Sequence, residues 1–86
     1  MHYVYIIQSE KTRELYFGRT DNLEQRLKEH NRGNNFSTRN KRPWSYLYLE
    51  GYRSEKDAIS RELKLKHYGN ARTYIKKRLK HSLLSK

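Results

Sequence analysis

The chain has 86 residues, no cysteine, and 20 Lys or Arg residues against nine Asp or Glu, which gives a formal net charge of +11. This length predicts a single domain, residues 1–86, with a small core, and the lack of cysteine excludes disulfides, thiolate metal sites and cysteine nucleophiles. Neither an apolar run that could span a bilayer nor a leader peptide is present, so we expect a cytoplasmic protein with no membrane partner.

Positive charge is concentrated in the C-terminal part of the chain. Residues 61–86 contain nine basic residues and one acid, whereas residues 1–60 contain eleven basic residues and eight acids. An excess of this size is typical of proteins that bind a polyanion such as nucleic acid, although some small basic proteins use it for solubility or membrane-surface contact. The charge therefore indicates a class of partner but no reaction.

The N-terminal segment predicts a β-hairpin. Residues 2–8 are apolar at successive positions, as in a central strand, and residues 14–19 form the partner strand across the polar turn 10–13. If the turn pairs Ser9 with Glu14, Tyr5 lies opposite Gly18 and Tyr16 lies diagonally nearby on the same face. Two phenols and a bare glycine would then share one surface.

A helix over residues 21–31 follows, because Asp21 and Glu24 resemble a capping box and Gly33 is placed to end the helix. Residues 32–45 lack periodicity and carry four positive charges, which indicates a basic loop. Residues 46–52 predict a third strand in which tyrosine and leucine alternate, with one amphiphilic and one apolar face.

Two helices complete the predicted order ββαβαα, a small α+β fold with helices packed on a sheet. The first covers residues 55–67, capped by Ser54 with Asp57, and stops before Gly69. The second covers residues 71–84, and its apolar side consists of Ala71, Tyr74, Ile75 and Leu79.

One acid falls on the predicted buried side of the helix 55–67. Glu62 lies within the arc formed by Ala58, Ile59, Leu63 and Leu65 on a helical wheel. It is either a carboxylate at the edge of the stripe, paired with an arginine, or a metal ligand. Mg²⁺ prefers oxygen ligands and keeps several waters, so one carboxylate and a substrate phosphate could complete a site.

Arg26 and His30 lie one turn apart on the first helix, on the side where Leu23 and Leu27 face the core. Separately, each has an ordinary interpretation as a surface arginine or a core histidine. Together they suit phosphate chemistry, because arginine binds phosphate bidentately and histidine transfers protons near neutral pH.

With these residues in place, the chain resembles the GIY-YIG nuclease family, and more closely its small stand-alone bacterial members with a UvrC-type catalytic core. The resemblance rests on Tyr3-Val4-Tyr5, on Tyr16-Phe17-Gly18-Arg19 eleven residues after Tyr5, on Arg26 with His30-Asn31, and on Arg61-Glu62. Tyr3 replaces the family's glycine and Phe17 its isoleucine, so the spacing together with Arg26 and Glu62 carries the match.

The resemblance implies a three-stranded antiparallel sheet flanked by helices, and hydrolysis of DNA phosphodiesters with one divalent metal ion, Mg²⁺ or Mn²⁺. It implies that Glu62 holds the metal, Arg26 binds and stabilises the phosphate, Tyr5 activates the water, and Tyr16 orients the phosphate or the water. His30 stands where some relatives have tyrosine, and Arg19 where UvrC-type domains often have lysine. Because the pKa of a free tyrosine is about 10, the base remains open between Tyr5, His30 and a metal-bound water.

The sequence therefore predicts a metal-dependent DNA endonuclease or nickase, structure-selective and acting in repair or recombination, with RNA as an alternative substrate. The alternatives are a catalytically silent nucleic-acid-binding module of the same fold and an adaptor domain. We expect a monomer or a weak homodimer. Backbone contacts to DNA are expected from Arg19, Arg39, Lys41, Arg42, Lys64, Lys66, Lys76 and Lys77.

Overall fold

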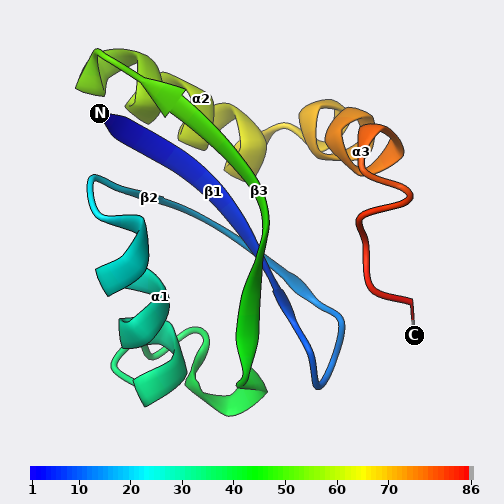
Figure 1. Cartoon of the computed structure of the whole chain (residues 1–86). Helices are drawn as coiled ribbons and strands as arrows, with labels where there is room; N and C mark the ends of the chain where they lie inside the picture. The colour runs from blue at the N-terminus through cyan, green and yellow to red at the C-terminus, as the bar shows by residue number, and fades with distance from the viewer. Residues whose placement is uncertain (86) are drawn as a thin grey trace.

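The computed structural model describes residues 1–85, which form one three-stranded antiparallel sheet with helices on both faces (Figure 1). The strands lie in the order β2-β1-β3, so the apolar first strand is central as predicted. The elements are β1 (His2–Ser9), β2 (Leu15–Thr20), α1 (Leu23–Arg32), the 3₁₀ helix η1 (Arg39–Lys41), β3 (Trp44–Tyr52), α2 (Glu55–His67) and α3 (Gly69–Arg78). Within residues 1–85, no helix is long and apolar enough to cross a membrane.

The hairpin has the predicted register. The amide of Ser9 donates to the carbonyl of Glu14 at 2.9 Å, and Tyr5 is paired with Gly18. A Cβ atom on Gly18 would lie 2.3 Å from the hydroxyl oxygen of Tyr5. Glycine is therefore needed here, because the phenol of Tyr5 lies directly against the backbone of β2.

Replacing Gly18 with alanine should displace the Tyr5 ring and lower the free energy of unfolding by about 1–3 kcal/mol, the usual cost of overpacking. Urea denaturation followed by circular dichroism measures this effect. Gly69→Ala is the matched control, because its Cβ would meet nothing closer than Arg72 Nη2 at 3.9 Å. Equal stability of the Gly18 and Gly69 variants would contradict the assigned packing of Tyr5.

The third strand departs from the predicted alternation. A register shift between Ile6 and Ile7 leaves Ile6 opposite Tyr48 and Ile7 opposite Tyr46, so Leu47 is an extra residue in β3. A bulge of one residue changes which face the following side chains occupy. Tyr46 consequently packs with Tyr5 on the face covered by α1, whereas Tyr48 packs against the core under α2.

Helix α1 begins two residues later than predicted. Asn22 caps the helix, because its side-chain oxygen accepts from the Gln25 amide at 3.0 Å, and Asp21 lies outside. Gly33 ends the helix in the left-handed conformation at φ 83°, as predicted. Asn31 then joins the helix to β3, because its Oδ1 accepts from the Trp44 amide at 2.7 Å and its Nδ2 donates to the Trp44 carbonyl at 3.0 Å.

Helix α2 has the predicted bounds, but its buried stripe is narrower. Ala58 and Leu65 are buried, whereas Ile59 and Leu63 are exposed, contrary to the prediction. Ala58 and Leu65 lie on the side of α2 that packs on the sheet. On a helical wheel, Ile59 and Leu63 lie about 100° and 140° around the helix from Ala58, so both point away from the sheet. Ser54 is the N-cap residue, yet its side chain makes no capping bond within the described chain.

A polar cluster fixes the rotation of α2 against the sheet. The Glu50 carboxylate accepts from Arg61 Nε at 2.9 Å and Arg61 Nη2 at 3.0 Å, and also from the hydroxyls of Tyr48 and Tyr52. Burial acts to raise the pKa of Glu50, but these bonds outweigh it and hold the pKa below its usual value. The bidentate contact orients α2 so that Glu62, the next residue, lies at the β2 edge.

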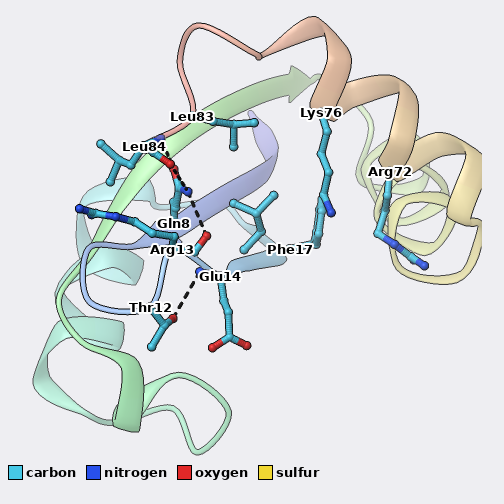
Figure 2. Close-up of a pocket in the computed structure, with 10 residues that line it drawn as sticks. Gln8, Thr12, Arg13, Glu14, Phe17, Arg72, Lys76, Leu83 and Leu84 are labelled. Carbon is cyan, nitrogen blue, oxygen red and sulfur yellow. Dashed lines mark hydrogen bonds between the residues drawn. The ribbon is translucent and has the colours of Figure 1, made fainter. Parts of the chain in front are cut away.

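The C-terminal helix is shorter than predicted. Helix α3 ends at Arg78, and Tyr74, predicted to be apolar-facing, is 68% exposed. Residues after the helix return toward the hairpin, where the Gln8 side chain bonds the backbone of Leu84 (Figure 2). Pairing of this tail with Gln8 replaces the predicted last helical turn. A groove of about 580 Å³ lies between the hairpin end, α3 and the tail (Figure 2).

Candidate active site

A chain of hydrogen bonds links β1, α1 and the loop before η1 in the interior. The Tyr5 hydroxyl lies 2.8 Å from His30 Nε2, and His30 Nδ1 lies 2.7 Å from the Thr38 hydroxyl. All three side chains are buried. Both ring nitrogens of His30 are therefore occupied, and its position is fixed from two sides.

Two further tyrosines pack around this chain. The Tyr16 ring centroid lies 5.2 Å from that of His30, and the Tyr46 centroid lies 5.7 Å from that of Tyr5, both edge to face. The Tyr46 hydroxyl donates to the Leu23 carbonyl at the start of α1. Tyr16 is partly exposed, so it forms the solvent side of the cluster.

Two arginine side chains, those of Arg26 and Arg19, have a buried Nε donor without a hydrogen-bond partner among residues 1–85. Arg26 acts electrostatically on Tyr5 and His30, whereas Arg19 Nε lies 3.4 Å from Glu62 Oε1 in an ion pair. Arg26 is only loosely paired, with Nη1 3.6 Å from Glu29 Oε1. Buried donors without partners are rare in folded proteins and indicate a place for an acceptor. Arginine donors of this kind suit an anion.

Glu62 lies at the β2 edge beside these groups, and 16% of its side chain is exposed. Its carboxylate oxygens contact Arg19 Nε at 3.4 Å and Lys66 Nζ at 3.0 Å. Lys66 also lies over the Tyr16 ring, 5.8 Å from the centroid, which connects α2 to the tyrosine cluster. Within residues 1–85, no three His, Cys, Asp or Glu side chains gather into a metal-binding group.

Burial shifts the titration of the two bonded groups in opposite directions. It raises the pKa of Tyr5 above the usual 10, with Tyr16 adding to the shift and the Arg26 guanidinium opposing it. Burial, and then Arg26, lower the pKa of His30 below the usual 6.5. At neutral pH, the phenol therefore keeps its proton and the imidazole is uncharged.

The lowered pKa of His30 predicts a pH dependence of stability. Between pH 6.5 and the lower pKa of the folded protein, the unfolded chain protonates this histidine while the folded chain does not, so the free energy of unfolding should fall as the pH falls, by at most about 1.4 kcal/mol per pH unit for one proton. Urea titrations between pH 7 and pH 5 measure this slope. His30→Gln should flatten it, and an unchanged slope in that variant would show that His30 is not its source.

Two residues of this cluster were not predicted from the sequence. Thr38 lies in a segment without periodicity, so nothing in the sequence indicated that it is buried against His30. Tyr46 was assigned to the same face as Tyr48, and the bulge in β3 separates them. The only signal for Thr38 was its place in a loop that returns from α1 toward β3.

The predicted DNA-contacting residues lie in three different places. Arg19 and Lys66 lie at the candidate site, but both are paired with Glu62. Lys76 lies on the other face of the sheet, in the groove lined by Leu15 and Phe17. The remaining members are on the loop side or on exposed parts of α2 and α3: Arg39, Lys41, Arg42, Lys64 and Lys77.

Comparison with known proteins bears directly on this arrangement. A family model described as the GIY-YIG catalytic domain matches residues 1–77. The chain belongs to the GIY-YIG family. The match confirms the resemblance that was based on the spacing of the tyrosine, arginine and glutamate residues. The observed α+β fold, a three-stranded antiparallel sheet with helices, agrees with membership in this family.

Several relatives of this GIY-YIG chain are named UPF0213 proteins. One from Clostridium perfringens is 42% identical over 67 residues, covering 77% of this chain and 71% of its own. Another from Staphylococcus haemolyticus is 38% identical over 68 residues, which cover 78% of this chain and 82% of the relative. A third from Haloquadratum walsbyi is 37% identical over 68 residues, covering 78% and 75%. Their names specify no reaction, and no solved structure matches this chain significantly.

Membership in the GIY-YIG family places the chain among nuclease domains, whose substrates are nucleic acids. The five residues predicted to be catalytic lie at or beside the cluster. Tyr5 and His30 are hydrogen-bonded, Tyr16 packs on His30, Arg26 lowers the pKa of His30, and Glu62 reaches Tyr16 through Lys66.

Proposed function

We propose that this chain is a divalent-metal-dependent DNA endonuclease or nickase that hydrolyses a phosphodiester at the Tyr5–His30 cluster. The observation that carries the proposal is the buried Nε donor of Arg26, which has no hydrogen-bond partner among residues 1–85 and belongs to a guanidinium that acts electrostatically on the hydrogen-bonded Tyr5–His30 pair. Such a site provides a positive charge that can bind an anion, and a proton acceptor beside it.

Arg26 is the residue we assign to the scissile phosphate. Its Nε donor lacks a partner, and its loose pairing with Glu29 leaves the guanidinium available for two parallel bonds to phosphate oxygens. Charge on these oxygens increases as water attacks. A guanidinium held in place before the reaction stabilises that charge without having to reorganise.

Tyr5 and His30 are assigned to proton transfer as a pair. The raised pKa of Tyr5 disfavours a free phenolate, so Tyr5 alone is a weak base at neutral pH. His30 is uncharged and bonded to the Tyr5 hydroxyl. With Nδ1–H donating to Thr38, Nε2 can accept the phenolic proton while the Tyr5 oxygen accepts one from water, which avoids a buried phenolate.

Glu62 is the residue that would hold the metal ion. One carboxylate suits Mg²⁺ or Mn²⁺, because a hard cation of this type is completed by water and substrate phosphate oxygens. The contact with Arg19 Nε at 3.4 Å is long, which leaves carboxylate lone pairs accessible. When bound, the ion would supply Lewis-acid stabilisation of the phosphate and the leaving group.

Cleavage of end-labelled DNA tests the proposal. Protein stripped of metal with EDTA should bind DNA without cutting it, and addition of Mg²⁺ or Mn²⁺ should start cleavage. Linear duplex, forked duplex and single-stranded oligonucleotides of equal length, with an RNA counterpart, identify the substrate class. Cleavage that continues undiminished in EDTA would contradict the metal dependence.

A catalytically silent binding module is the second candidate. The pairing of both Glu62 oxygens with Arg19 and Lys66 favours it, because a metal ion must compete with these two cations. This candidate predicts DNA binding that is independent of metal, with no cleavage of any of these substrates.

A further inference from the structure

One aromatic side chain stands out on the surface of the basic loop between α1 and β3. Phe36 is 80% exposed, more than any other large hydrophobic side chain in the described chain. The other strongly exposed aromatic rings, Tyr68 and Tyr74, belong to the region of α2 and α3. Exposure of a phenylalanine ring is unfavourable in water, so the ring has no evident part in stabilising the fold.

Phe36 is exposed although the loop that carries it is ordered. The Asn35 side chain accepts from the Ser37 amide at 2.9 Å, and the Asn35 carbonyl accepts from the amides of Thr38 and Arg39 at 3.2 and 3.0 Å. Trp44 Nε1 donates to the Thr38 carbonyl at 2.8 Å. These bonds on both sides fix the backbone at Phe36, so a ligand would meet a prearranged ring.

The surroundings of Phe36 are cationic. The Arg39 guanidinium lies over the ring, 4.7 Å from its centroid, and Arg42 Nε donates to the Arg39 carbonyl at 2.7 Å. No Asp or Glu occurs between residues 30 and 49. An exposed aromatic ring beside guanidinium groups combines a stacking surface for a base with donors for the adjacent phosphates.

We propose that Phe36 is a stacking site for an unpaired nucleobase, and that it makes the protein prefer DNA with single-stranded or splayed bases over continuous duplex. This inference rests on the proposed function, because it names the class of DNA that the same protein binds. Bases within a duplex are stacked on one another and cannot cover the ring, whereas an unpaired base can.

The loop also connects this ring to the candidate active site. Thr38, two residues after Phe36, bonds His30 at 2.7 Å, so this short segment has Phe36 exposed at one end and, at the other, Thr38 bonded to the buried Tyr5–His30 pair. A strand whose unpaired base stacks on Phe36 would therefore bring nearby phosphates close to Arg26 and Tyr5. The stacking site would bind a branch point next to the bond to be cut.

Fluorescence anisotropy in EDTA tests this inference without cleavage. The probes are a forked duplex with a short unpaired arm and a continuous duplex of the same length. Phe36→Ala should weaken binding of the fork about 5- to 140-fold, the effect of losing about 1–3 kcal/mol of stacking, while duplex affinity changes less than twofold. Phe36→Trp should keep the preference for the fork, and Tyr74→Ala, the matched exposed-aromatic control, should leave both affinities unchanged.

The result that would overturn the inference is an equal loss of fork and duplex binding in Phe36→Ala, or no loss of either. A different result is expected if the stacking site is correct but the protein is not a nuclease. Wild-type protein would then bind the fork with a Phe36-dependent preference and leave it uncut after Mg²⁺ is added. Cleavage without any fork preference would instead support the nuclease assignment and reject the stacking site.

Discussion

Replacing Glu62 with glutamine should abolish Mg²⁺-dependent DNA cleavage without weakening DNA binding in EDTA. Glutamine keeps the shape of the side chain but provides a neutral amide, which is a poor ligand for a hard divalent cation. Loss of the negative charge also releases Arg19 and Lys66, which can then contact the DNA backbone directly. Cleavage is measured by gel assay with Mg²⁺, and binding by anisotropy with EDTA.

Glu55 provides a matched control for this substitution. Glu55 also pairs with Arg19, at 3.3 Å, but its side chain is 58% exposed and it lies about two turns before Glu62 on α2. Glu55→Gln therefore removes a charge from the same arginine without removing the assigned metal ligand, and cleavage should persist. If Glu62→Gln cuts DNA as fast as wild type, the assignment of Glu62 to the metal is wrong.

Replacing Arg26 with alanine should lower the single-turnover cleavage rate by about 100- to 1000-fold, equivalent to about 3–4 kcal/mol of transition-state stabilisation. The reason is that its unpartnered Nε donor and loosely paired guanidinium are available to the phosphate as charge develops. Arg26→Lys should recover only part of the rate, because an ammonium cannot form the two parallel bonds.

The control for Arg26 is Arg32→Ala on the same helix. Arg32 is exposed near the C-terminal end of α1 and contributes the same formal charge. Its loss should change the rate less than about threefold, through long-range electrostatics that decrease with added salt. A similar small change in Arg26→Ala would reduce Arg26 to an ordinary backbone contact.

Much of the fold could be predicted because local chemistry determines it. The turn after Ser9 fixes the hairpin register, and that register places Tyr5 opposite Gly18, as observed. Gly33 ends α1 because it adopts a positive φ. The first strand is apolar on both faces, which is typical of a strand in the middle of a sheet, and it lies between β2 and β3. Each of these features depends on residues close together in the sequence or on burial of both strand faces.

The errors have a different physical origin, since they depend on contacts between distant segments. The bulge at Leu47 depends on how β3 pairs with β1, and it moves Tyr46 to the sheet face that α1 covers, beside Tyr5. The narrow stripe on α2 depends on the Arg61–Glu50 bond, which turns Ile59 outward. The tail fails to extend α3 because Leu84 pairs with Gln8, 76 residues earlier.

The residues singled out for the candidate site came from the sequence, but the contacts that connect them did not. Arg26, His30 and Glu62 could be selected because polar groups on an apolar helix face need a partner or a use. The sequence did not indicate that Thr38 holds His30, or that Arg19 and Lys66 both pair with Glu62. Such partners come from separate elements, and only the folded arrangement brings them together.

Single-turnover nicking of supercoiled plasmid tests the proposed nuclease function most directly, because one cut at any position converts the substrate to open circles. Wild-type protein in excess over plasmid, with Mg²⁺, should produce open circles at a rate that Glu62→Gln reduces to background. Plasmid that stays supercoiled, although the wild-type protein binds it as tightly as in EDTA, would contradict a nuclease and identify a binding module.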